Sequence, residues 1–194
     1  AVAVELDVTI AGQVAAAAKL ATDVQLLINN AGVAQSMGVP LVADNAVEVA
    51  RSECEVNVFG LMTLTQAFSG ILNANGGGAV VNLASVASFV NFPMAQSYSA
   101  TKAAVHSITQ GLRLVMPNTL IVGVYPGPVD TDMAADMPME KATPATVANE
   151  ILDGVEQGEA YVLPDPMAKD MGAGFFASPK ALEENVAAMA AQQA

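Results

Sequence analysis

A tyrosine and a lysine one helical turn apart are the residues of this sequence best suited to proton transfer. Tyr98 precedes Lys102 by four positions, and Ser85 lies thirteen residues before the tyrosine. Four residues make about one turn of a helix, so the phenol and the ammonium are expected on one face. A cation beside the hydroxyl favours the phenolate and lowers the pKa of tyrosine from its reference of about 10. The pair therefore predicts a general acid/base that works near neutral pH.

Apolar runs of strand length alternate along the chain with longer stretches that have helical spacing. The runs predict strands at residues 2–6, 24–28, 79–83, 120–125 and, more weakly, 161–163. The longer stretches predict helices at residues 12–21, 45–72, 98–115, 144–156 and 179–192. Thr143 and Ser178, each followed by a proline, are expected to cap the last two helices. Because crossover helices cover both faces of a parallel sheet, this alternation predicts an α/β fold with a doubly wound parallel sheet.

Several polar or glycine-containing segments directly follow the predicted strands. In a doubly wound sheet, ligands bind at the carboxyl ends of the strands, where these segments lie. Five segments, in their order along the chain, resemble the motifs of the short-chain dehydrogenase/reductase family. They read NNAG at 29–32, EVNV at 55–58, NLAS at 82–85, YSATKAA at 98–104 and PGPVDT at 126–131. By this resemblance the chain is identified as a member of that family, with a sheet of the Rossmann type.

The resemblance implies a set of four catalytic residues. Tyr98 would be the general acid/base, and Ser85 would hydrogen-bond the carbonyl oxygen of the substrate. Lys102 would lower the pKa of Tyr98 and hold the ribose of the nicotinamide, and Asn57 would anchor a water molecule that joins Lys102 to solvent. Hydride that reaches a carbonyl carbon builds negative charge on the oxygen, which the serine hydroxyl and the tyrosine proton can neutralise. The implied activity is hydride transfer between a cofactor, NAD or NADP, and a carbonyl compound or secondary alcohol.

The resemblance also implies which residues contact the cofactor. Besides Tyr98 and Lys102, they are Asp7 and Val8 at the adenine, Asn29, Ala31 and Gly32 along the adenosine ribose, and Pro126, Gly127, Val129 and Thr131 around the nicotinamide. A structural interpretation stands beside this one. The segment at 29–32 also stabilises the central sheet in this family, and a Pro-Gly pair forms an ordinary turn in most proteins. No metal is expected, because the single His106 has no neighbouring Cys or His.

The glycine-rich turn with which the family binds the cofactor pyrophosphate has no counterpart in the sequence. Two βα units, or roughly sixty residues at about 30 residues per βαβ unit, are expected before the strand at 2–6. The glycines at 76–78 precede a strand instead of following one, and those at 172 and 174 lie in the tail. The sequence is therefore expected to be N-terminally incomplete, whether as a fragment or because its first part was cleaved, deleted or left out. The choice between NAD and NADP stays open, since the discriminating residues belong to the missing part.

A second hypothesis is non-catalytic. The truncated domain would persist as an assembly or interaction module built on the helices at 45–72 and 98–115, which form the usual subunit contacts in the resembling family. That resemblance implies a homodimer or homotetramer. Without the missing units, the apolar strand at 24–28 would also lie at an uncovered sheet edge, which invites pairing with another chain.

Composition sets further bounds. With 194 residues and 53% apolar content, the sequence predicts one domain, 1–194, with one sizeable core. The formal charge of −12 disfavours contact with nucleic acid phosphates, and no apolar run reaches the ~20 residues of a membrane span. The single Cys54 cannot form an internal disulfide, which is compatible with the cytoplasmic location that we expect.

The substrate of the predicted enzyme is a small molecule of unspecified identity. Met and Phe side chains gather in two segments, 133–141 and 164–176, that would cover it: Met133, Met137, Met139, Met167, Met171, Phe175 and Phe176. They suggest an apolar pocket or lid, although a helical core or a subunit contact explains them equally well.

Overall fold

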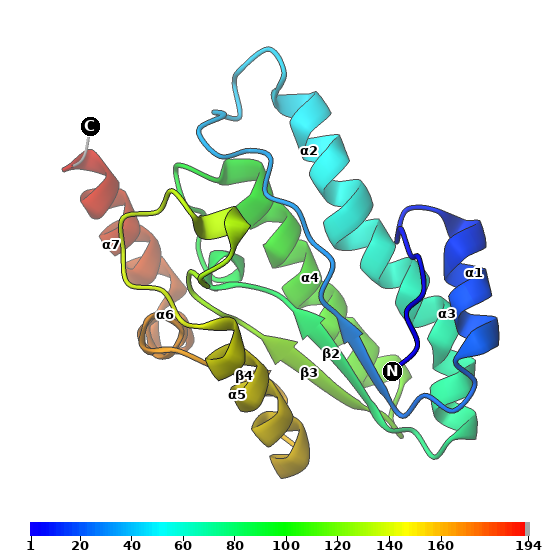
Figure 1. Cartoon of the computed structure of the whole chain (residues 1–194). Coiled ribbons are helices and arrows are strands. Elements are labelled where there is room, and N and C mark those ends of the chain that lie inside the picture. The colour runs from blue at the N-terminus through cyan, green and yellow to red at the C-terminus, as the bar shows by residue number, and fades with distance from the viewer. Residues whose placement is uncertain (193–194) are drawn as a thin grey trace.

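The computed structural model describes residues 1–192 and is built around a four-stranded parallel sheet (Figure 1). The strands are β1 (Leu26–Asn29), β2 (Ala79–Leu83), β3 (Leu120–Val124) and β4 (Tyr161–Val162), paired in that order. Val80, Val122 and Val124 are fully buried, as expected for strands that are covered on both faces. The predicted parallel α/β fold is confirmed.

Helices cover both faces of the sheet. They are α1 (Ala11–Leu20), α2 (Ala46–Cys54), α3 (Leu61–Ala74), α4 (Gln96–Val115), α5 (Pro144–Gln157), α6 (Pro166–Ala177) and α7 (Pro179–Ala191). A π-helical segment (Glu55–Gly60) joins α2 to α3 without a break, and 3-10 turns lie at Val86–Ser88 and Asp132–Ala134. α1, α3 and α4 lie on one side of the sheet and α5 on the other (Figure 1), which is the doubly wound arrangement. Within residues 1–192, no helix combines the length and the apolar content needed to cross a membrane.

Apolar side chains on both faces hold the helices against the sheet. On one face, Phe68 and Leu72 of α3 join Val80 of β2 in an apolar cluster. On the other face, Val147 and Ile151 of α5 belong to the cluster around β3. Full burial of one such side chain contributes roughly 1.5–3 kcal/mol, so these contacts fix α3 and α5 against the sheet.

Side-chain caps begin the last three helices. Thr143, Asp165 and Ser178 each accept a hydrogen bond from the backbone N–H three residues further on, and a proline follows each of them. The caps predicted at Thr143 and Ser178 are confirmed. α6 is missing from the predicted helices, although Met167, Met171 and Phe175 recur every four residues, as residues along one face of a helix do.

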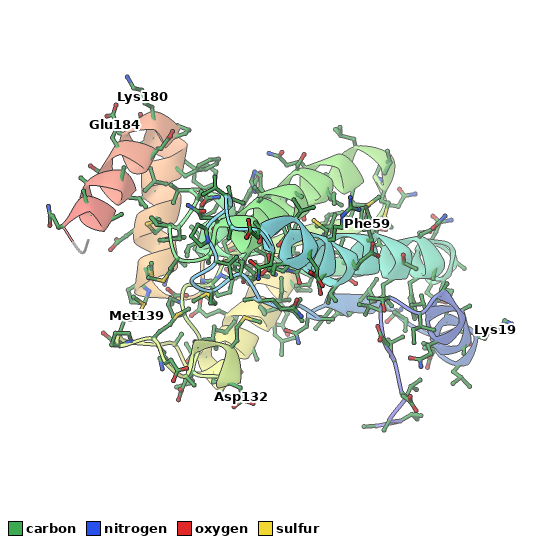
Figure 2. All side chains as sticks on the ribbon, turned by 90° about the horizontal axis from the view of Figure 1, so that it is seen from above. Lys19, Phe59, Asp132, Met139, Lys180 and Glu184 are labelled. Atoms are coloured by element: carbon green, nitrogen blue, oxygen red, sulfur yellow. The ribbon has the colours of Figure 1, made fainter. Side chains whose placement is uncertain are left out.

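α7 lies at the outer edge of the molecule, where Lys180 and Glu184 are paired at 3.5 Å (Figure 2). Both side chains are largely exposed, so this pair contributes only about 0.3–0.5 kcal/mol. Burial of Leu182 and Val186 is what holds the helix in place.

The N-terminal segment contradicts one prediction. Residues 2–6 form no strand, and Val2, Val4 and Leu6 are 87%, 42% and 39% exposed. No described strand lies beside this segment, so its backbone N–H and C=O groups find no ladder partners, and apolar composition alone does not make a strand. β1 is the edge of the described sheet, and Ile28 is 43% exposed there, as predicted for the run at 24–28.

The glycines at 76–78 form the turn into β2, as the sequence predicts. Gly77 and Gly78 have positive φ values of +98° and +59°. A Cβ atom on Gly78 would lie 2.0 Å from the carbonyl oxygen of Gln25, and one on Gly77 would lie 1.8 Å from that of Asn118. The turn therefore requires glycine for both its conformation and its close approach to neighbouring backbone.

These distances predict unequal costs for two glycine-to-alanine substitutions. Gly158 ends α5 with φ +72° but has open space around its Cβ position, so Gly158→Ala should cost only the left-handed strain of about 1–2 kcal/mol. Gly78→Ala adds a backbone clash and should lower the unfolding free energy further, measured by urea denaturation. Equal losses in the two variants would contradict the role given to this turn.

Candidate active site

Ser85 directly follows the carboxyl end of β2 and caps the first 3-10 turn. Its Oγ accepts a hydrogen bond from the N–H of Ala87 at 3.1 Å and donates to the carbonyl oxygen of Pro126 at 3.4 Å. Its own N–H donates to Ser88 Oγ at 3.3 Å, which completes a capping box. The serine is partly exposed and is held on both sides by backbone groups.

Tyr98 and Lys102 lie close together on α4, as their spacing predicts. The Lys102 ammonium lies 5.5 Å from the centroid of the Tyr98 ring. Lys102 is only 5% exposed, and its Nζ donates to the carbonyl oxygen of Leu83 at 2.7 Å. Its backbone carbonyl accepts from Ser88 Oγ at 2.8 Å, so one residue ties α4 both to the end of β2 and to the 3-10 turn that follows it.

The pKa of Tyr98 is raised in this structure, not lowered as the spacing of Tyr98 and Lys102 predicts. Burial raises the pKa of Tyr98 to about 12, with the Ser85 hydroxyl lowering it in part and the charge of Glu53 raising it further. Burial also lowers the pKa of Lys102 to about 8. The ammonium donates to a carbonyl oxygen rather than to the phenol, and burial is the largest cause of the upward shift in the pKa of Tyr98.

Asn57 lies in the π-helical segment and is 2% exposed. Its Oδ1 accepts from the N–H of Val33 at 2.8 Å, and its Nδ2 donates to the carbonyl oxygen of Val33 at 2.9 Å and to Thr101 Oγ1 at 3.0 Å. A Cβ atom on Gly32 would lie 3.3 Å from Asn57 Oδ1 and 3.6 Å from Lys102 Nζ. The missing side chain of Gly32 thus leaves room beside both of these polar groups.

Asn29 belongs to a buried polar network that joins β1 and β2 to α3 and α4 on one face of the sheet. Its Nδ2 donates to Thr65 Oγ1 at 3.1 Å and to Asn82 Oδ1 at 2.8 Å, and Asn82 Nδ2 donates to Thr109 Oγ1 at 2.9 Å. These contacts support the structural interpretation of Asn29, in which the segment at 29–32 stabilises the central sheet. The Oδ1 of Asn29 is buried, however, and has no hydrogen-bond partner within the described chain.

The other residues predicted to contact the adenine and the adenosine ribose differ in their exposure to solvent. Asp7 is exposed, and hydrogen bonds from Thr9 hold the pKa of its carboxyl below the usual value. Val8 is buried in the core, where a Cβ atom on Gly60 would clash with its side chain. Ala31 is exposed beside the partly buried Gly32.

The segment at 126–131 is fixed from two directions. The carbonyl oxygen of Pro126 accepts from Ser85 Oγ and from the N–H of Val86, and the N–H of Gly127 donates to Asp165 Oδ2 at 2.8 Å. Val129 forms an isolated parallel bridge with residue 142, and the exposed Thr131 donates back to its carbonyl oxygen at 3.2 Å. The segment predicted to surround the nicotinamide is therefore hydrogen-bonded to Ser85 on one side and to Asp165, the cap of α6, on the other.

Comparison with known proteins shows the family to which the chain belongs. A family model described as short chain dehydrogenase matches residues 1–142. A short chain dehydrogenase from Burkholderia cenocepacia, solved in complex with NADP, is 37% identical and has a TM-score of 0.89; 95% of this chain and 80% of that chain are covered. The chain belongs to the short-chain dehydrogenase family.

Curated relatives in the short-chain dehydrogenase family are longer than this chain. It is 35% identical over 148 residues to the NADPH-dependent 1-acyldihydroxyacetone phosphate reductase of Saccharomyces cerevisiae, which covers 75% of this chain and 46% of that protein. It is 31% identical over 140 residues to an uncharacterized oxidoreductase of Staphylococcus saprophyticus, which covers 69% of this chain and 58% of that protein. The chain thus spans about half the length of these two relatives.

Sequence reasoning missed three residues that contact this site. Asp165 precedes a proline, which is a recognisable signal for a helix cap, but nothing in the sequence indicates its bond to Gly127. Glu53 and Ser36 join residues far apart in the chain, and neither belongs to a motif. Only the tertiary contacts reveal them.

An aromatic cluster lies behind the site. Phe89 stacks on Tyr125 and on Phe175, with centroids 4.7 and 4.8 Å apart, and His106 Nδ1 lies 2.8 Å from Tyr125 Oη. The core interpretation of Phe175 is therefore favoured over a lid, and His106 packs within the same cluster. Of the other residues considered for a lid, Met139 is 48% exposed (Figure 2). Within residues 1–192, no group of three or more metal-binding side chains occurs.

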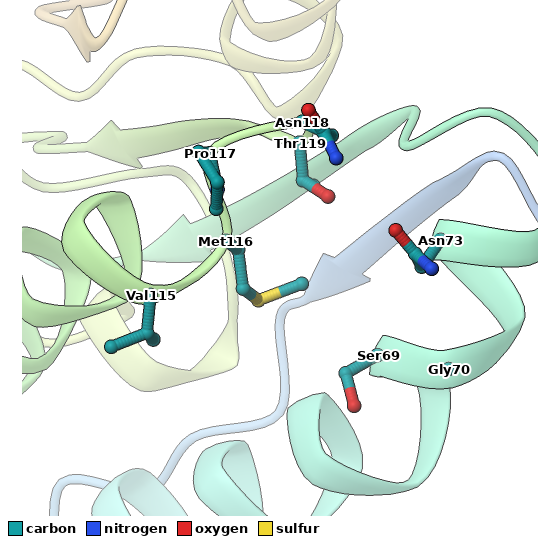
Figure 3. A pocket seen from close by; sticks show the side chains of 8 residues that line it. All are labelled: Ser69, Gly70, Asn73, Val115, Met116, Pro117, Asn118 and Thr119. Atoms are coloured by element: carbon teal, nitrogen blue, oxygen red, sulfur yellow. The ribbon is translucent and has the colours of Figure 1, made fainter.

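A cavity of about 240 Å³ lies at the opposite end of the sheet, before β2 and β3 (Figure 3). Its walls come from the end of α3 and from the loop between α4 and β3: Ser69, Gly70, Asn73, Val115, Met116, Pro117, Asn118 and Thr119. None of these side chains is charged, and the cavity is remote from the carboxyl ends of the strands, where ligands bind in such sheets. We assign it no role.

The depressed pKa of Lys102 predicts how stability varies with pH. Between pH 8 and 10 the lysine of the unfolded chain, which has the ordinary pKa of 10.5, binds more protons than the folded one, so the unfolding free energy should rise with pH. The rise expected from this residue is about 2 kcal/mol. Lys102→Met should remove it, measured as the difference between the two proteins in urea at each pH. A constant difference between pH 8 and 10 would show that Lys102 is not desolvated as described.

Proposed function

We propose that this chain is the catalytic part of an oxidoreductase that uses a nicotinamide cofactor to interconvert a carbonyl compound and a secondary alcohol. The observation that supports it is the convergence of Ser85, Tyr98 and Lys102 at the carboxyl end of β2 in a chain of the short-chain dehydrogenase family. Relatives of known structure carry NADP in one case and NAD in another. Both cofactors therefore remain candidates.

The residues present fit the two ribose groups of such a cofactor. Lys102 uses one of its three ammonium donors on Leu83, and Gly32 leaves space beside Lys102 and Asn57. The unpaired Oδ1 of Asn29 offers a further acceptor. Among the described residues, the glycines at 76–78 lead into a strand and those at 172 and 174 lie within α6, so neither group forms a phosphate-binding turn between a strand and a helix.

When bound, the nicotinamide supplies or accepts the hydride. The protein's own residues donate a proton and a hydrogen bond to the oxygen of the substrate. Tyr98 is protonated at neutral pH, because burial raises its pKa to about 12, so its phenol can donate a proton to the oxygen that becomes negative during reduction. The Ser85 hydroxyl, held beside Pro126, donates a second hydrogen bond to the same oxygen. In the reverse direction the phenolate form of Tyr98 would receive the proton of the alcohol.

A second candidate function, assembly, is supported by exposed apolar residues on the helices predicted to make subunit contacts. Phe59 and Met62 are 52% and 48% exposed, and Leu114 and Val115 at the end of α4 are 84% and 72% exposed. Phe59 is labelled in Figure 2. The assembly would be of identical subunits, and analytical ultracentrifugation of the 194-residue chain tests it. A monomer at all concentrations would contradict this second candidate.

A cofactor titration tests the first proposal. Saturable binding of NADPH or NADH to the purified chain should enhance the fluorescence of the reduced nicotinamide and raise the melting temperature. At 100 times the Kd, stabilisation of about 2.7 kcal/mol is expected. A folded sample that binds neither cofactor would contradict the proposed function for this chain.

Replacement of the proposed acid/base gives a second test. Tyr98→Phe should reduce turnover at least about 100-fold, because only the proton-donating hydroxyl is lost, while cofactor affinity stays nearly unchanged. Tyr161→Phe is the matched control: this tyrosine stacks on Tyr125 in the aromatic cluster and should be dispensable for turnover. Retained turnover in Tyr98→Phe would refute the assignment.

A further inference from the structure

Glu53 is a completely buried carboxylate without a cationic partner in the described chain. Its Oε1 accepts hydrogen bonds from the N–H groups of Gln35 and Ser36 at 2.7 and 2.8 Å, and its Oε2 accepts from Ser97 Oγ at 2.6 Å. A buried charge is strongly unfavourable unless such donors satisfy it. All three donors belong to segments that border Tyr98.

Ser36 continues the chain of contacts to α4. It is 1% exposed, and its Oγ accepts from the N–H of Tyr98 at 3.1 Å. The residue that should cap α4, Ala95, provides no side-chain hydrogen bond, so the N–H groups of the first turn need partners from elsewhere. Ser36, from a distant part of the sequence, caps the helix at the proposed acid/base itself.

Glu53 and Asn57 hold the same segment one helical turn apart. Asn57 binds both backbone groups of Val33, and Glu53 binds the next N–H groups along the chain, those of Gln35 and Ser36. The backbone at 33–36 is thereby clamped along the helical run from α2 to α3. This clamp sets where the Ser36 hydroxyl points.

We infer that Glu53 is a positioning residue that fixes the first turn of α4, and with it the Tyr98 phenol, through Ser36 and Ser97. The inference rests on the acid/base role proposed above for Tyr98. Glu53 also acts by its charge, which raises the pKa of Tyr98 beyond the effect of burial. The charged groups that face Tyr98 are Glu53 from α2 and the Lys102 ammonium from α4, and the neutral Ser85 faces it from the turn after β2.

Amide hydrogen exchange tests the positioning role without any turnover. In the full 194-residue chain, Ser36→Ala and Glu53→Ala should speed exchange of the Tyr98 amide about tenfold or more relative to that of Val105 in the middle of α4. Glu53→Gln should keep this ratio within about threefold, because its amide oxygen still accepts from both N–H groups. Ile151→Ala, a core variant on the opposite face, is the control for general destabilisation and should leave the ratio unchanged. An unchanged ratio in Ser36→Ala overturns the inference, even if Glu53→Ala does not fold.

The pH dependence of turnover supplies a readout that a merely structural role would not move. Ser36→Ala should lower kcat about tenfold with the KM for the cofactor within about twofold. Glu53→Gln should retain kcat, while its alkaline limb moves to lower pH, because loss of the carboxylate charge makes the phenol easier to ionise. An alkaline limb that stays in place in Glu53→Gln overturns the charge effect. A wild-type chain that binds no cofactor would contradict the proposed function alone, and the exchange ratios would then decide the inference.

Discussion

The double attachment of Lys102, to the end of β2 and to the turn that follows it, is the interaction on which the arrangement of the site depends. The ammonium donates to the carbonyl oxygen of Leu83, and the backbone carbonyl of the same residue accepts from Ser88. α4 is therefore registered against the turn that carries Ser85. Because Tyr98 lies one turn before Lys102, this attachment places the first turn of α4, which carries the phenol, beside the serine hydroxyl.

Three ionisable side chains around the site are buried without forming ion pairs with one another. Glu53 is satisfied by backbone N–H groups and a serine, Lys102 by a carbonyl oxygen, and Asp165 by the N–H groups of Gly127 and Ala168. Each charge is thus stabilised by hydrogen bonds with polar groups of loops and helix ends. The effect is mechanical as well as electrostatic, since most of these bonds join two segments that are distant in sequence.

Much of the fold follows from the sequence, because strand-length apolar runs and amphipathic stretches differ in period. The run at 79–83 forms β2 without a change of boundary. The segment at 2–6 forms no strand because a strand needs a neighbour, which no local pattern can supply. The site divides in the same way: the spacing of Tyr98 and Lys102 identifies the pair, whereas the upward pKa shift of Tyr98 depends on burial, and the contacts of Glu53 depend on a clamp between distant segments. Such effects appear only once the chain has folded.

The π-helical segment has a consequence for the phase of the helical run. α2 turns polar side chains toward the backbone at 33–36, while α3 turns Phe68 and Leu72 toward the sheet, and the wider turn at 55–60 lies between them. Each residue of an α-helix advances by about 100°, so removal of one residue from this turn would rotate α2 by that angle relative to α3. α3 would keep Phe68 and Leu72 in the core, while the side chain of Glu53 would turn away from Ser36. The π turn therefore acts as a rotational offset that lets one continuous helix serve the core with one half and the site with the other.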